Sequence, residues 1–140
     1  ETGFPGMKLL QFAFDSREES DYIPHLYPRN VIAYTGTHDN ETTATWFKNL
    51  PKADLQYCLD YINHQGAGSP VDSLIKSTLG CIADTAIIPM QDYLGLEDEG
   101  RMNIPSTTGN NWRWRMLESE ITKDLLKKIK SFTLLYGRGY

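Results

Sequence analysis

The sequence lacks the patterns that mark several common classes of protein. Its 140 residues include two cysteines, Cys58 and Cys81, and neither stands in a C-x-x-C pair. A zinc site needs three or four ligands, and His25 and His64 have no further ligand types grouped around them. No Gly-rich loop follows a predicted strand, and no serine has nucleophile-elbow spacing. We therefore expect no metal and no cofactor.

Positive charge and long apolar runs are also scarce. The formal net charge is -4 and the pI is about 5.3, so we expect neither nucleic acid nor an anionic membrane as a partner. No apolar run approaches the roughly 18 residues that a membrane span requires. Both cysteines stand in apolar-periodic stretches, which predicts buried free thiols and favours a reducing cytoplasm as the location.

Aromatic residues are plentiful, with three Trp and eight Tyr. Aromatic faces stack on sugar rings as well as filling cores, so the composition permits carbohydrate binding without demonstrating it. The chain opens on Glu1 and Thr2, without Met, and runs almost directly into an apolar strand. We expect it to be a piece of a longer protein.

Short apolar runs alternate with segments of helical periodicity. The predicted strands cover residues 8–14, 31–34 and 86–90, and the predicted helices cover residues 42–47, 53–65, 72–83 and 122–135. Residues 95–114 form a long loop rich in Gly, Pro, Asn and Thr, and loops of this length are usually functional or disordered. This order predicts an α/β fold with a parallel sheet and outer helices. Three strands are too few for a closed barrel and suit part of one.

The sharpest local feature is the polar cluster at residues 35–40, directly after the strand at 31–34. It places His38 and Asp39 at the carboxyl end of a buried parallel strand, which is the active-site face of α/β barrels. In the alternative interpretation, Asp39 and Asn40 cap the following helix and His38 packs beneath them.

Two further features carry polar side chains. Asp92 follows the third predicted strand, where it either serves the site or caps the next helix. The loop from Arg101 to Arg115 alternates Trp and Arg near its end, and these residues either contact carboxylates and sugars or attach the loop to the body of the protein.

These motifs together resemble the 4-α-glucanotransferase, or amylomaltase, family. The matching stretches, in the same order as in the family, are Gly3-Phe4-Pro5-Gly6-Met7-Lys8, Leu10-Gln11-Phe12-Ala13-Phe14-Asp15, Tyr34-Thr35-Gly36-Thr37-His38-Asp39-Asn40, Gln91-Asp92, and Arg101-Met102-Asn103 through Asn111-Trp112-Arg113-Trp114-Arg115. Each stretch alone is weak evidence for the family, but five stretches in the same order are specific to it. The resemblance implies a (β/α)8 TIM barrel of the α-amylase clan, of which residues 1–140 would be a single partial domain holding about the last three β/α units.

The resemblance also implies the chemistry. Family members move segments of α-1,4-glucans such as maltooligosaccharides, starch or glycogen, with retention, by means of three carboxylates. Asp39 matches the carboxylate that stabilises the transition state, and His38, Phe12 and Asn103 match substrate contacts. The nucleophile and the acid/base of the family precede the first motif, so we expect this chain alone to be inactive. Because three barrel strands would leave open edges, we also expect the free chain to be less stable or more associated than a natural domain of this size. The rival interpretations are a non-catalytic carbohydrate-binding module, centred on Trp112 and Trp114, and a purely structural piece.

Overall fold

The computed structural model describes residues 3–139 and contains a three-stranded parallel sheet. The strands are β1 (Gly6–Leu9), β2 (Val31–Tyr34) and β3 (Thr85–Ile87), in the order β1-β2-β3. Ala33 at the centre of β2 pairs with both neighbouring strands and is fully buried. The expected α/β fold with a small parallel sheet is confirmed. Glu1 and Thr2, on which the expectation about the start of the chain rests, lie outside the described residues.

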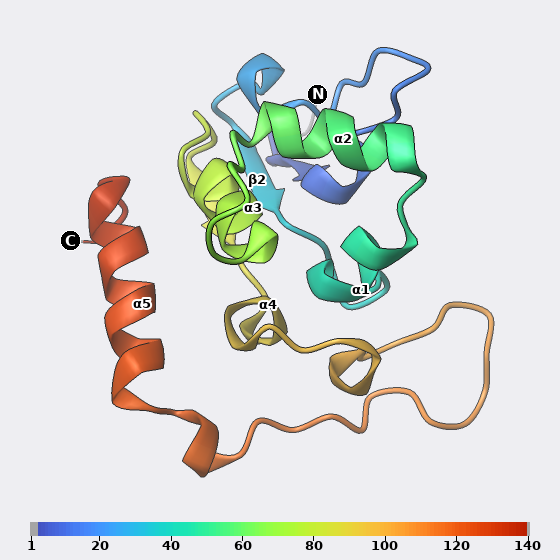
Figure 1. The fold of residues 1–140 in the computed structure, drawn as a ribbon, viewed down its shortest axis with the longest axis vertical. Helices are drawn as coiled ribbons and strands as arrows, with labels where there is room; N and C mark the ends of the chain where they lie inside the picture. The colour runs from blue at the N-terminus through green and yellow to red at the C-terminus, as the bar shows by residue number, and fades with distance from the viewer. Residues whose placement is uncertain (1–2, 140) are drawn as a thin grey trace.

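Within residues 3–139, five α-helices accompany the sheet (Figure 1). They are α1 (Thr43–Asn49), α2 (Lys52–Tyr61), α3 (Pro70–Leu79), α4 (Met90–Leu94) and α5 (Lys123–Leu135). In Figure 1, α1 and α4 lie beyond the end of the sheet toward which the β2 arrow points, and α5 runs along one side of the molecule. No helix within residues 3–139 combines the length and the apolar character needed to cross a membrane.

Four single 3-10 turns complete the described part of the chain. They are η1 (Leu10–Phe12), η2 (Pro24–Leu26), η3 (Asp98–Gly100) and η4 (Glu118–Glu120). Apart from η3, residues 95–114 contain no helix or strand in the described structure, so the predicted long loop is confirmed. Figure 1 shows this part of the chain making a wide excursion past α1 before it returns to α5.

The core lies between β2 and the helices that follow it. Leu74 and Ile75 of α3 and Cys58 of α2 are fully buried in one cluster with Val31 and Ala33 of β2. Complete burial of one Leu or Ile side chain stabilises a fold by about 1.5–3 kcal/mol. The buried free thiol expected at Cys58 is confirmed, whereas Cys81 is free but only partly buried.

Two strand boundaries differ from the sequence prediction. The first strand ends at Leu9 because the chain turns into η1, where the amide of Ala13 bonds to the Leu10 carbonyl. The third strand ends at Ile87 because Pro89 has no amide proton for a ladder bond and its fixed φ suits the start of α4. Pro70 likewise begins α3, two residues before the predicted start.

Candidate functional site

The segment that follows β2 is held by its own hydrogen bonds. The side-chain oxygen of Asn40 accepts bonds from the Thr37 amide at 2.9 Å and the Thr37 hydroxyl at 2.8 Å. The residue that caps α1 is Thr42, whose side chain accepts a bond from the Thr45 amide. The alternative in which Asp39 and Asn40 cap this helix is therefore wrong, and Asp39 is left at the carboxyl end of the strand with its side chain half exposed.

The structure brings three of the four predicted site residues together. The side-chain nitrogen of Asn103 donates to Oδ1 of Asp39 at 2.6 Å. His38 places its Nε2 3.4 Å from the same oxygen. The backbone amide of Asn103 also bonds to the His38 carbonyl at 3.1 Å. Strand direction predicts that His38 and Asp39 lie at the carboxyl end of the β2 strand and face the same mouth as Asp92 or Asn103, and the contacts with Asn103 confirm this.

Phe12 stands apart from this group. It lies in η1, directly after β1, and its side chain is 53% exposed. Its ring packs edge-to-face against Tyr22, with centroids 5.5 Å apart. None of the contacts found within residues 3–139 joins Phe12 to His38, Asp39 or Asn103. Because parallel strands end at one edge of the sheet, Phe12 still belongs to the same end of the molecule.

The long loop is pinned beside this site by an aromatic pair. The ring of Trp112 packs on His38 with centroids 4.8 Å apart, although half of the Trp112 side chain stays exposed. The Trp112 backbone has a φ of 63°, in the left-handed region that non-glycine residues seldom adopt. Its amide bonds to the Met102 carbonyl at 2.6 Å. The alternating Trp and Arg pattern pointed to this loop, but not to a contact with His38.

Arg101 is a site residue that the sequence analysis placed in a motif without giving it a role. Its Nε donates to the Asn103 carbonyl at 3.1 Å and its Nη2 to the Asp39 carbonyl at 3.3 Å. Its Nη1 lies 3.8 Å from a carboxylate oxygen of Glu41. One guanidinium therefore contacts both chain segments that carry the central hydrogen bond.

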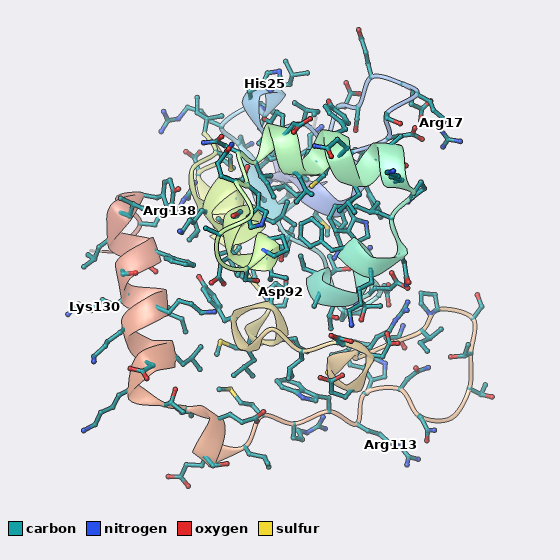
Figure 2. The ribbon with its side chains drawn as sticks, viewed as in Figure 1. Arg17, His25, Asp92, Arg113, Lys130 and Arg138 are labelled. Atoms are coloured by element: carbon teal, nitrogen blue, oxygen red, sulfur yellow. The ribbon has the colours of Figure 1, made fainter. Side chains whose placement is uncertain are left out.

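Asp92 lies behind the site, and the residue is only 3% exposed (Figure 2). It accepts hydrogen bonds from the Thr35 hydroxyl at 2.5 Å, the Thr43 amide at 2.9 Å and the Thr43 hydroxyl at 2.8 Å. Burial raises the pKa of Asp92 above its usual value, and the three hydrogen bonds oppose that rise. Asp92 thus joins the end of β2 to the start of α1 rather than capping α4, and it lies, largely buried, in the lining of the cavity that His38 also lines.

A cavity of about 160 Å³ opens at the carboxyl ends of β2 and β3. Its lining includes His38, Glu41, Gln91, Arg101 and Met102. Among the described residues no group of three potential ligands is placed to hold a metal ion. The site offers the carboxylates of Asp39 and Glu41, the Asn103 amide, the His38 imidazole and nearby aromatic rings, a set suited to hydrogen bonding and stacking with a polyol.

Comparisons with known proteins identify the family of this chain. The family model described as 4-alpha-glucanotransferase matches residues 1–121. The chain is 42% identical to a 4-alpha-glucanotransferase of Streptococcus pneumoniae over 98% of its own length and 27% of that protein. It is 41% identical to a chloroplastic/amyloplastic 4-alpha-glucanotransferase of Solanum tuberosum over 96% of its own length and 24% of that protein.

A solved structure matches the fold itself. The amylomaltase from Streptococcus agalactiae in complex with acarbose superposes with a TM-score of 0.95 at 38% identity, covering 99% of this chain and 28% of the amylomaltase. The chain thus spans about a quarter of the length of the relatives that it matches. A match of this extent, in sequence and in fold, shows that the chain belongs to the 4-alpha-glucanotransferase family, glycoside hydrolase family 77.

Proposed function

We propose that this chain is the C-terminal part of the catalytic (β/α)8 barrel of a 4-α-glucanotransferase, contributing about its last three β/α units. We also propose that Asp39 stabilises the transition state of transfer between α-1,4-glucans. The observation that carries the proposal is the placement of the Asp39 carboxylate at the carboxyl end of β2, held at 2.6 Å by Asn103. In barrel enzymes the reacting groups stand at this end of the strands.

The carboxylates of the chain suit a supporting role in a retaining transfer. Such a reaction needs one carboxylate to attack the anomeric carbon and a second to protonate the leaving oxygen, about 5–5.5 Å apart. Asp39 is exposed at the site, whereas Asp92 is buried and occupied by three donors. The resemblance to the family implies that the nucleophile and the acid/base belong to the remainder of the enzyme, so the proposal includes that the 140-residue chain alone has no transfer activity.

The role of Asp39 follows from where charge develops. The transition state resembles an oxocarbenium ion, so a fixed carboxylate nearby stabilises it more than it stabilises the bound glucan. His38 and Asn103 flank the same carboxylate oxygen and present donors to sugar hydroxyls. Phe12 and Trp112 offer half-exposed rings for stacking on sugar faces. α-1,4-Glucans such as maltooligosaccharides, starch or glycogen are the proposed substrates.

The cytoplasm is the proposed location. Cys58 and Cys81 are both free thiols, which supports a reducing compartment. The potato relative is named as a chloroplastic/amyloplastic protein, so a plastid is the alternative.

Asp39→Asn in the full-length enzyme tests the proposal. Asn keeps the shape of Asp and loses its charge, so the initial rate of transfer from maltotriose falls roughly 10²–10³-fold while maltooligosaccharide affinity changes little. Asp84→Asn is the matched control, because Asp84 precedes β3 at the opposite end of the sheet and pairs at the surface with Arg29. Wild-type turnover in the Asp39 variant would refute the proposed role.

The exposed ring of Trp112 favours one other function, a non-catalytic carbohydrate-binding surface. In that case Asp39→Asn and Trp112→Ala would both weaken glucan binding, and the full-length wild-type protein would release no glucose from maltotriose. Calorimetric titration with maltoheptaose, run beside the transfer assay, distinguishes the two functions.

A further inference from the structure

Two loops that are distant in sequence meet at the Asp39 carboxylate. Asp39 follows β2, and Asn103 lies 64 positions later in the long loop. Neither residue belongs to a helix or a strand, so the regular hydrogen-bond ladders do not hold either of them in place. The 2.6 Å bond between their side chains therefore depends on whatever fixes the two backbones relative to each other.

One backbone bond, from the Asn103 amide to the His38 carbonyl, joins the two segments directly, and the Arg101 guanidinium adds contacts from three different nitrogens. Nη2 bonds to the backbone carbonyl of Asp39 and Nε bonds to the backbone carbonyl of Asn103. Nη1 faces the Glu41 carboxylate at 3.8 Å, and the two side chains are only 21% and 31% exposed. The Glu41 backbone carbonyl in turn accepts a 3.0 Å bond from buried Gln11, which ties this point to the start of η1.

We propose that Arg101 is a positioning residue that clamps the Asp39 and Asn103 segments together and so aims the Asp39 carboxylate. This inference rests on the proposed function, because the carboxylate that it aims is the one proposed to stabilise the transition state. Arg101 acts through backbone carbonyls and leaves both oxygens of the Asp39 carboxylate free for Asn103, His38 and substrate.

The clamp requires arginine rather than a positive charge alone. A guanidinium is planar and carries five N–H donors in a fixed fork, so it reaches two carbonyls and a carboxylate at once. A lysine ammonium is a single point charge on a flexible stem and cannot hold the two carbonyls in the same geometry. We therefore expect that Arg101→Lys keeps the positive charge but no longer holds the Asp39 carboxylate in its position.

Arg101→Lys and Arg101→Ala in the full-length enzyme test the clamp, with Arg29→Lys and Arg29→Ala as matched controls. Arg29 is an exposed arginine that also pairs with a carboxylate, but it precedes β2 at the opposite end of the sheet. We expect kcat for maltotriose disproportionation to fall at least roughly tenfold in Arg101→Lys and further in Arg101→Ala, because poorly placed electrostatic groups lose transition-state stabilisation. KM should change less than threefold, and the Arg29 variants should match the wild type.

A double-mutant cycle tests whether Arg101 positions the Asp39 carboxylate or has another role. If Arg101 acts through the Asn103–Asp39 contact, Arg101→Lys costs much less kcat in an Asn103→Ala background than in the wild type. Additive effects of the two substitutions would overturn the proposal, because they would mean that Arg101 binds substrate directly or supports another part of the fold. An unchanged kcat in Arg101→Lys would also overturn it.

The outcomes also separate this inference from the proposed function. If the wild type transfers glucans and Asp39→Asn does not, while Arg101→Lys is fully active, only the clamp is refuted. If Asp39→Asn is fully active, the proposed role of Asp39 fails first and the clamp fails with it. Thermal unfolding of each Arg101 variant, measured beside the Arg29 variants, shows that a loss of kcat does not arise from unfolding.

Discussion

The side-chain nitrogen of Asn103 donates a 2.6 Å hydrogen bond to Oδ1 of Asp39, across 64 positions of sequence. The donor is a neutral amide, so it orients the carboxylate without cancelling its charge. His38 lies 3.4 Å from the same oxygen. Within residues 3–139, no hydrogen bond or ion pair involves the second carboxylate oxygen, and the Asp39 side chain is half exposed.

Asn103→Asp should damage transfer more than Asn103→Ala does. A hydrogen bond to a charged group is worth about 1.5–3 kcal/mol, so its removal in the Ala variant should lower kcat roughly 10–100-fold. The Asp variant adds repulsion between two carboxylates at hydrogen-bond distance. Initial rates of transfer at pH 7, measured on the full-length enzyme, check the order.

The pH dependence of the transfer rate supplies the control for the comparison of Asn103→Asp with Asn103→Ala. As the pH falls from 7 toward 5, one proton can be shared between the two carboxylates of the Asp variant, and its rate should approach that of the Ala variant. Two variants with the same rate at pH 7 would contradict a direct contact between positions 39 and 103.

Trp112→Ala should lower kcat about 3–10-fold, whereas Trp112→Phe should keep most of the activity. The aromatic contact with His38, with centroids at 4.8 Å, is worth roughly 0.5–1.5 kcal/mol beyond its buried area, and a phenyl ring preserves part of it. Transfer rates and maltoheptaose affinity of both variants check this. Equal losses in the two variants would indicate that the indole nitrogen matters rather than ring packing.

Substitution of Asp92 should change the stability of the protein rather than its transfer chemistry. Asp92→Ala leaves the buried Thr43 amide and the hydroxyls of Thr35 and Thr43 without their acceptor, which should cost at least about 1–3 kcal/mol in the free energy of unfolding. Asp92→Asn retains an acceptor for the amide, and hydroxyls can rotate to accept from its nitrogen. The Ala variant should therefore unfold at a lower temperature than the Asn variant.

The raised pKa of Asp92 fixes the sign of a pH effect. Because the folded protein holds this proton more tightly than the unfolded chain, the stabilisation from Asp92 is full below about pH 4 and decreases as the pH rises through the folded pKa. Asn does not titrate. The stability of Asp92→Asn relative to the wild type should therefore increase between pH 4 and pH 7, and a constant difference in thermal midpoint would contradict this.

The strand-end location of the site could be predicted from sequence because it depends on local pattern. The apolar run before residue 35 and the polar residues after it specify a buried strand that ends in a polar loop. The same reasoning gave the approximate positions of α2, α3 and α5, whose apolar faces repeat with helical period. Boundaries were less accurate at the prolines and at η1, where single backbone bonds decide the end of an element.

The contacts between loops could not be predicted in this way. No periodicity links Arg101 to the carbonyls of Asp39 and Asn103, because an irregular loop reaches its partners through its whole path in space. The burial of Asp92 also escaped prediction, since its partners Thr35 and Thr43 lie 57 and 49 positions away. The resemblance to a family supplied the site residues, whereas the geometry that holds them required the structure.

Self-association of the 140-residue chain, produced on its own, is the remaining prediction. The sheet ends at β1 on one side and at β3 on the other, so in the described structure these two strands each have one unpaired edge. Apolar side chains are exposed on or near both strands, with Phe4 at 82%, Met7 at 53% and Ile87 at 45%. Open strand edges beside exposed apolar groups favour pairing between chains. Light scattering should show species larger than the 16.0 kDa monomer at micromolar concentration.

Met7→Lys is the variant that tests the cause of this association. A lysine on an edge strand opposes pairing with a second chain, because it would place a charge in the new interface. Since half of the Met7 side chain is exposed, the substitution removes little buried area within the monomer. The average mass from light scattering should therefore fall toward that of the monomer. A wild-type chain that is monomeric and unfolds cooperatively at about 45–65 °C would show instead that these edges are protected within the chain itself.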